Sequence, residues 1–122
     1  MKYLILLYND ARQWEAWRNS SPEEAQRARA EEMPRWTAAM GWMSEQGIEA
    51  TGLELEDPHQ ARVVRVRDGK PVVTDGPFAE TKEVLGGYFL VDCKDLDQAI
   101  ELAQRIPLVD KGSVEIRPLV EQ

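Results

Sequence analysis

Residues 3–8 read Tyr3-Leu4-Ile5-Leu6-Leu7-Tyr8, an unbroken apolar run that ends at Asn9-Asp10. The run has the length of a strand rather than of a helix. A strand that is apolar on both faces has to be covered on both faces. The segment Tyr88-Phe89-Leu90-Val91 has the same character, so we expect two strands of one sheet that is covered on both sides.

A helix is expected after the first strand. Ser21-Pro22-Glu23-Glu24 supplies an N-cap, a proline at the first helical position and a glutamate suited to a capping box. A stripe at helical spacing follows, made of Met33, Trp36, Met40, Met43 and Gly47. Because Pro34 interrupts this stripe, the helix is expected either to kink there or to begin near residue 33.

The second half of the chain adds a hairpin, a helix and a last strand. Residues 62–67, the Asp68-Gly69 pair and residues 70–74 predict a β-hairpin. Asp95-Leu96-Asp97-Gln98 is a second capping box. It opens a helix whose predicted buried face contains Leu96, Ala99, Ile100 and Ala103. Residues 114–120 predict the final strand.

This order of elements predicts one α+β domain over residues 1–122, with the ferredoxin-like βαββαβ plan and an extra β-hairpin in the middle. Two helices can cover only one face of such a sheet, whereas its central strands are apolar on both. The economical cover for the second face is another copy of the sheet. We therefore expect a homodimer through the sheet face that forms a dimeric α+β barrel.

Composition narrows the classes of partner. The chain of 122 residues is 43% hydrophobic and 30% charged, which is typical of a soluble globular protein. Its 22 acidic and 15 basic side chains give a net charge of −7, which repels phosphate backbones, so we expect no direct nucleic-acid binding. The local basic cluster Arg62, Arg65, Arg67 and Lys70 alternates with valines, as solvated charges on strands do.

Cellular location is predicted from two features. Cys93 is the single cysteine, which excludes an internal disulfide and indicates a reducing compartment. The apolar run at residues 3–8 is too short for a signal-peptide core or a membrane span. We expect a cytoplasmic protein with no membrane partner.

The densest group of candidate site residues lies at Thr74–Glu83, where acids, a tight turn, an aromatic ring and a lysine share ten positions. Asp75 precedes Gly76-Pro77, so its carboxylate either fixes the turn or serves as a general acid–base or ligand-binding group. Lys82 either binds a carboxylate or enolate of a small substrate or forms a surface pair with Glu80 or Glu83. Glu80 is also a candidate for ligand binding.

Aromatic residues supply the other candidates for ligand contact. Phe78 and Tyr88 are either core residues or contacts to a polar ligand in the barrel interior. Trp14 and Trp17, three residues apart in a polar segment, predict a short helix that folds over a pocket or over a partner subunit.

No metal or cofactor is predicted. His59 is the single histidine and there is no pair of thiols, so zinc has no ligand set. A loop histidine at this position is typical of the surface rather than of a haem ligand. Gly86-Gly87 leads into a strand, whereas a phosphate-binding glycine motif opens a helix.

The whole chain resembles the YCII-related proteins, in the branch named for its Asp-Gly-Pro-Phe motif and also called the DGPFAETKE family. The complete motif stands at residues 75–83. Further matching stretches are Lys2–Asp10, Val64–Pro71, Leu85–Phe89, Asp95–Ile100 and Gly112–Pro118.

The resemblance implies a ferredoxin-like fold that pairs into a dimeric α+β barrel, and no settled biochemical function. Smaller relatives carry a histidine in the first helix and an aspartate, proposed as an acid–base pair. This chain keeps the aspartate as Asp75, but its first helix has Met33, Arg35 and Trp36 and no histidine. Some relatives are fused to, or encoded beside, sigma factors, which implies a link to transcription.

Two functions follow from these patterns. The first is a small cofactor-free enzyme in which Asp75 moves a proton on a small carbonyl or lactone-like substrate, with support from fold analogy alone. The second is a non-catalytic ligand-binding or regulatory module linked to a sigma factor through protein contacts. A closed polar pocket with a buried Asp75 favours the enzyme, and a filled interior with an exposed apolar patch favours the partner protein.

Overall fold

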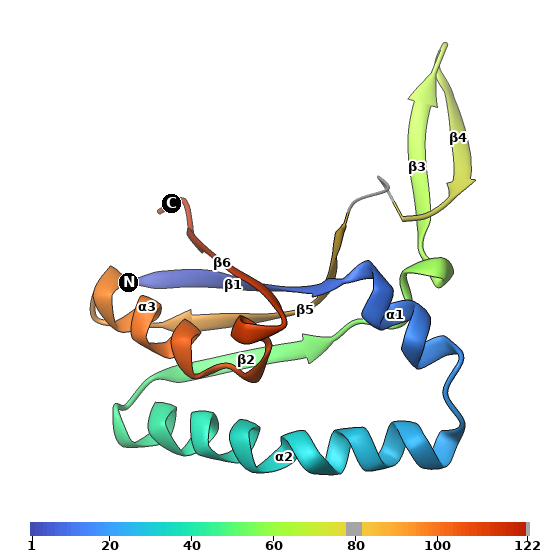
Figure 1. Cartoon of the computed structure of the whole chain (residues 1–122). Coiled ribbons are helices and arrows are strands. Elements are labelled where there is room, and N and C mark those ends of the chain that lie inside the picture. Colours follow the sequence, from blue (N-terminus) through green and yellow to red (C-terminus); the bar gives the residue numbers. More distant parts are fainter. Residues whose placement is uncertain (78–81, 122) are drawn as a thin grey trace.

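The computed structural model describes residues 1–77 and 82–121, and its centre is a four-stranded antiparallel sheet (Figure 1). The strand order is β2 (Glu49–Glu54), β5 (Glu83–Asp92), β1 (Lys2–Asp10) and β6 (Gly112–Pro118). Helices α2 (Pro22–Glu45) and α3 (Leu96–Arg105) connect these strands. This α+β arrangement is compatible with the predicted ferredoxin-like plan.

Five further elements complete the chain. Helix α1 (Ala11–Arg18) follows β1 directly, and the 3₁₀ turn η1 (Pro58–Gln60) precedes a separate hairpin. The hairpin consists of β3 (Arg62–Arg67) and β4 (Lys70–Asp75). A second 3₁₀ turn, η2 (Pro107–Asp110), leads from α3 into β6.

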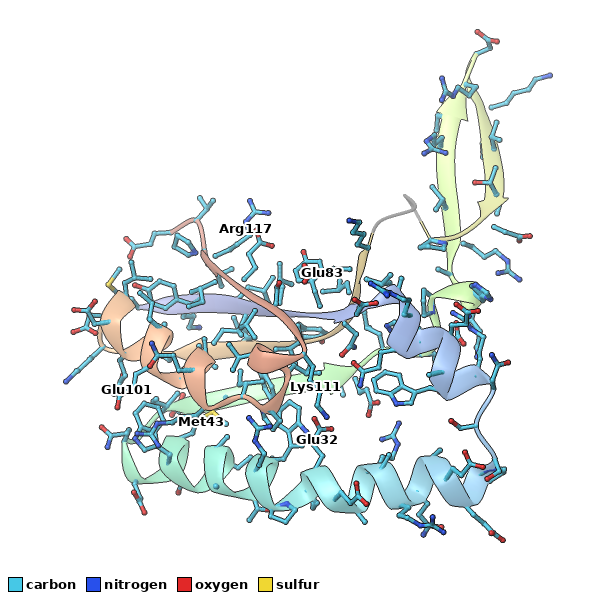
Figure 2. The ribbon with its side chains drawn as sticks, viewed as in Figure 1. Glu32, Met43, Glu83, Glu101, Lys111 and Arg117 are labelled. Atoms are coloured by element: carbon cyan, nitrogen blue, oxygen red, sulfur yellow. The ribbon has the colours of Figure 1, made fainter. Side chains whose placement is uncertain are left out.

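One face of the sheet is covered by α2 and α3, and the core lies there (Figure 1). Tyr3, Ile5 and Leu7 of β1 are buried on this face, because alternate residues of a strand point to the same side. Figure 2 shows Met43 between α2 and the sheet. The remaining buried members of the cluster are Ile48, Val91, Cys93, Ala99, Leu102, Ile106 and Leu108.

The opposite face of the sheet, called here the open face, is covered by no helix among residues 1–77 and 82–121. Leu4 and Leu6 of β1 are half-buried there and pair across the ladder with Leu90 and Tyr88 of β5, which are also half-buried. Leu53 of β2 continues the apolar surface and is 68% exposed. The central strands are therefore apolar on both faces, as predicted, and the chain by itself covers one of them.

The helices differ from the prediction in two respects. The N-cap at Ser21 is confirmed, since its hydroxyl accepts a hydrogen bond from the Glu24 amide, and α2 runs unbroken from Pro22 through Pro34. A start near residue 33 is therefore wrong. The predicted buried stripe is also wrong in part, because Met33 and Met40 are 55% and 56% exposed. The face that packs carries Ala39 and Met43, with Trp36 and Trp42 half-buried beside it.

Helix α3 shows a similar displacement of its buried face. Its N-cap is Asp95, as predicted, and the carboxylate accepts from the Gln98 amide at 2.9 Å. Ala99 and Ala103 are buried, but Leu96 and Ile100 are exposed. Leu102 takes the place of these two residues in the core, where it is fully buried.

The β3–β4 hairpin is confirmed at the predicted residues. Asp68 and Gly69 both have positive φ, 52° and 75°, as the two central residues of a type I′ turn require. Thirteen of its fourteen residues, 62–75, are exposed. Figure 1 shows that this hairpin projects away from the body, on the side of the sheet opposite α2.

A β-bulge distorts the ladder between β1 and β5. Leu7 pairs with Gly87, whereas the next residue, Tyr8, pairs with Leu85, so Gly86 is the extra residue. A Cβ atom at Gly86 would collide with the amide nitrogen of Asn9 and would lie 3.3 Å from Cζ2 of Trp14. The bulge therefore requires glycine in order to admit both side chains.

The substitution Gly86→Ala is expected to lower the free energy of unfolding by about 1–3 kcal/mol, because the buried Asn9 and Trp14 have to move. Gly41→Ala is the matched control. Gly41 lies within α2 with no atom within 4 Å of the added carbon, so this change should stabilise by about 0.5–1 kcal/mol. Urea unfolding of both variants measures the difference, and equal effects would contradict the assigned packing at the bulge.

Candidate functional site

A hollow of about 830 Å³ lies at one end of the open face, where β1 ends and β5 and β6 begin. It is open to solvent, and six of its seven lining residues carry a polar side-chain group. It is lined by Tyr8, Asp10, Lys82, Glu83, Ser113, Val114 and Glu115. The ladder brings these residues together from distant parts of the sequence, since Tyr8 pairs with Ser113 and Asp10 pairs with Glu83.

Two hydrogen bonds orient the carboxylates of the hollow. The Tyr8 hydroxyl donates to Oε1 of Glu115 at 3.1 Å. The Ser113 hydroxyl donates to Oε1 of Glu83 at 2.6 Å. Figure 2 shows Glu83 and Arg117 on the side of the sheet away from α2, which places this polar group on the open face.

Tyr8 stays a hydrogen-bond donor in this setting. Partial burial raises the pKa of its phenol, and the hydrogen bond to Glu115 and the charge of that carboxylate raise it further, while Arg117 opposes them. The neutral phenol is thus favoured throughout the physiological range. Tyr8 is suited to donate a proton in a hydrogen bond to a ligand, and not to act as a base.

Lys82 brings a cation to an otherwise anionic wall. Its main-chain carbonyl accepts a hydrogen bond from the Ala11 amide at 2.7 Å, which ties the entry of β5 to the start of α1. The lining therefore contains one ammonium group together with the carboxylates of Asp10, Glu83 and Glu115. An ammonium among carboxylates can bind a polarised carbonyl oxygen while a carboxylate accepts a proton.

Asp75 lies away from this lining, at the base of the hairpin. Its side chain is 87% exposed, and its Oδ1 lies 3.4 Å from Nε of Arg62. The Gly76 amide donates to the Ala61 carbonyl at 2.8 Å, which holds the backbone after Asp75, and the Gly76–Pro77 peptide bond is cis. The described residues thus leave the Asp75 side chain in solvent beside Arg62.

The remaining predicted contacts are scattered. Tyr88 is half-buried on the open face but does not line the hollow. Trp14 is buried by Gly86 and stacks edge-to-face on Trp17, with ring centroids 5.1 Å apart. The predicted short helix is thus confirmed as α1, which packs on its own subunit. The predicted contacts of Phe78 and Glu80 lie outside the described residues.

Two buried polar atoms beside α1 have no hydrogen-bond partner within the part of the chain that the structure describes. They are Oδ1 of Asn9 and Nε1 of Trp14. The first is an acceptor and the second is a donor, and both side chains approach Gly86. The bulge therefore holds a complementary pair of polar groups on the helix-covered face, behind the hollow.

The root of the hairpin is held by an ion pair. Nε of Arg18 in α1 donates to Oδ2 of Asp57 at 2.6 Å, and the His59 amide donates to Oδ1 at 2.8 Å. The hydrogen bond from Arg18 holds the pKa of Asp57 below its usual value, against the opposing effect of partial burial. His59 itself is exposed in η1, as expected of a loop histidine.

The described residues contain no cluster of histidine, cysteine, aspartate and glutamate that would hold a metal ion. Burial raises the pKa of the Cys93 thiol, so the thiol stays protonated and unreactive at neutral pH. Among the helices described, none has the length and apolar character needed to cross a membrane. The cytoplasmic location inferred from the single cysteine stays a prediction.

Comparison with known proteins shows the family. The YCII-related domain matches residues 1–122. The chain belongs to the YCII-related family. An uncharacterised protein of Rhizobium meliloti (strain 1021), R00369, is 37% identical to this YCII-related protein over 121 residues, which span 98% of the chain and 92% of the relative. The name of this relative states no activity, so function has to be argued from the site.

Sequence reasoning found Lys82 of the hollow and did not single out Tyr8, Asp10, Ser113 or Glu115 as site residues. A signal for them exists in the alternation of strand residues. Tyr8 and Asp10 share the face of Leu4 and Leu6, and Ser113 and Glu115 occupy the same face of β6 through the ladder. This signal becomes informative only when the strand register is known.

The substitution Asp57→Asn should lower the free energy of unfolding by about 1–2 kcal/mol at pH 7, because the charge-assisted hydrogen bond from Arg18 is lost. The folded-state pKa of Asp57 is depressed, so its contribution is present above the unfolded pKa and is lost as the pH falls through the folded pKa. Urea unfolding should therefore show the stabilities of the two proteins converging as the pH falls below the usual range of an aspartate pKa.

Glu54→Gln is the control for this experiment. Glu54 pairs with Arg29 at 2.9 Å, but the two side chains are 64% and 70% exposed, so the change should cost less than about 0.5 kcal/mol. An Asp57→Asn cost as small as that of Glu54→Gln would show that the hairpin root does not depend on the Arg18–Asp57 pair.

Proposed function

We propose that the protein acts as a homodimer that binds a small polar molecule in the hollow at the end of the open face. Cofactor-free acid–base chemistry on a small carbonyl or lactone-like compound is the reaction class that this hollow suits. The observation that carries the proposal is the hollow itself, in which Lys82 stands among three carboxylates and a protonated tyrosine. The finer assignment to the Asp-Gly-Pro-Phe branch rests on the motif at residues 75–83 and is part of the same proposal.

The groups of the hollow divide naturally between two tasks. Lys82 would hold a carbonyl or enolate oxygen through its ammonium group, and the Tyr8 hydroxyl would join it by turning its single proton from Glu115 to the ligand. A carboxylate of Glu83 or Glu115 would accept a proton from the adjacent carbon. Each of these carboxylates already receives a hydroxyl hydrogen bond, which keeps it in a fixed orientation.

A second subunit supports this function by excluding water. The hollow opens at the end of an apolar sheet face, and a copy seated on that face would roof it. The sheet would then be covered on both faces. The second copy would bury the apolar residues of the open face, which are Leu4, Leu6, Leu53, Tyr88 and Leu90. This homodimer through the sheet face is the same arrangement that the strand pattern predicts.

Asp75 stays a second candidate for proton transfer. It would have to leave Arg62 and lose its water to act as a general base, because its side chain is largely exposed in the single chain. Glu83 and Glu115 are exposed as well, but both already lie beside Lys82 and Tyr8 in the lining of the hollow. We therefore assign the proton-accepting role to Glu83 or Glu115 in preference to Asp75.

One observation favours a regulatory alternative. The hairpin and the open face both expose apolar side chains, and such surfaces are typical of protein contacts. In this alternative the protein binds another protein, with a sigma factor as the partner that the family resemblance implies. It requires no turnover and no ligand in the hollow.

A thermal-shift screen with small carboxylates, lactones and phenols tests the proposal. A compound that binds the folded state should raise the Tm of the wild type by several degrees, since a ligand at about 100 times its Kd adds about 2.7 kcal/mol. Lys82→Met and Tyr8→Phe should reduce the shift, because both side chains line the hollow. Lys94→Met, which removes an exposed lysine outside this lining, should leave it unchanged.

Asp75→Asn separates the two candidate sites in the same screen. A Tm shift that persists in Asp75→Asn and falls in Lys82→Met and Tyr8→Phe indicates that the ligand binds in the hollow. A Tm shift that is lost only in Asp75→Asn indicates that the ligand binds at the turn of residues 75–77. A dimeric wild type with no shift in the whole library would overturn the small-molecule function and leave the regulatory alternative.

A further inference from the structure

The β3–β4 hairpin, called here the arm (residues 62–75), is built in a way that its own subunit does not explain. A two-stranded hairpin without a packing surface is marginally stable in water. Yet Val64, Val66 and Val73 of the arm expose 63%, 70% and 62% of their surface. Valines carry strong strand propensity, but a solvated ribbon does not need them on an outward face.

Three of the five valines of the arm lie on one side. In an antiparallel ladder, directly paired residues share a face. Val64 pairs with Val73 and Val66 pairs with Pro71, so these four residues form one apolar face. Arg62 opposite Asp75 completes this face at the base of the arm. The other face carries Val63 opposite Thr74, Arg65 opposite Val72 and Arg67 opposite Lys70. The arm therefore has one face that is apolar towards its tip and one face that mixes three cations with uncharged residues.

The direction of the arm connects it to the open face. Figure 1 shows it rising from η1 on the side of the sheet opposite α2, beyond the start of β5. A second copy seated on the open face would occupy that same side. The arm would then run along the flank of the second copy, and the two-fold symmetry of such a pair would place a second arm on the first subunit.

Charge favours the same occupant. The arm has four cationic and two anionic side chains, a net charge of +2, within a chain of −7, so the remaining residues carry −9. Two bodies of −9 repel each other when they approach. Each arm brings a positive element to the body of the other subunit, which offsets part of this repulsion and makes a second copy of this chain a complementary partner.

We propose that the arm clasps a second copy of the chain, with the face of Val64, Val66, Pro71 and Val73 packed on the flank of the partner subunit. The clasp rests on the homodimer of the proposed function and adds to it a contact outside the sheet. The clasp would bury the valines that are exposed in the single chain. It would also order the arm, which leads into the motif at residues 75–83, when the dimer forms. Hydrogen exchange at the arm amides should accordingly be slow in the dimer and fast after dilution to the monomer.

The double substitution Val64→Thr with Val73→Thr tests the clasp, and Val63→Thr with Val72→Thr is its matched control. Threonine keeps the β-branched side chain, so both variants retain the strand propensity of the hairpin. Each places two hydroxyl groups on one face, the apolar face in the first variant and the opposite face in the control. Symmetry doubles each change in the dimer.

Sedimentation velocity over a dilution series measures the dimer dissociation constant of each protein. The Val64/Val73 variant should dimerise at least about 10-fold more weakly than the wild type, and the Val63/Val72 control should stay within about 2-fold. Equal dissociation constants for the two variants in a dimeric protein overturn the clasp and leave the sheet-face dimer standing. A wild type that is monomeric at every concentration overturns both, and arm amides that exchange equally fast in dimer and monomer overturn the clasp alone.

Discussion

The architecture depends on β1, a strand that is hydrogen-bonded along both edges and is apolar on both faces. It pairs with β5 on one side and with β6 on the other, so neither edge is available to solvent. Its helix-covered face carries Tyr3, Ile5 and Leu7 in the core. Its other face carries Leu4, Leu6 and Tyr8, which the chain leaves half-buried. The function of the protein therefore depends on what covers Leu4, Leu6 and Tyr8 on the open face.

The hollow and the arm both follow from this incomplete cover. The hollow marks the place where the open face changes from leucines to polar residues, at Tyr8 and Asp10. The arm stands beside the same face and carries apolar residues of its own. A monomeric protein of this design would expose two separate apolar surfaces, whereas one symmetric pairing would bury both. In the proposed function, association and ligand binding would therefore depend on the same face of the sheet.

Local rules predicted the elements well and their buried faces less well. The caps at Ser21 and Asp95 and the Asp68-Gly69 turn were readable because each depends on a few adjacent residues. The prediction that Met33 and Met40 lie on the buried stripe of the helix was wrong. A stripe at helical spacing does not determine which side of a long helix faces the sheet. The lining of the hollow could not be predicted from the sequence, for a different reason. Its walls come from three strand ends, and only the register brings Tyr8 beside Ser113.

The bulge at Gly86 has a consequence for which side chains reach the site. After the bulge, the even-numbered residues Tyr88 and Leu90 of β5 lie on the open face. Before the bulge, the odd-numbered residues Glu83 and Leu85 lie there, because they pair with Asp10 and Tyr8 of β1. One extra residue therefore reverses the parity of the strand. Without it, Val84 would take the place of Glu83, and the acid that Ser113 now orients would point at the helices. The glycine that makes room for Trp14 on one face thus selects the carboxylate presented on the other.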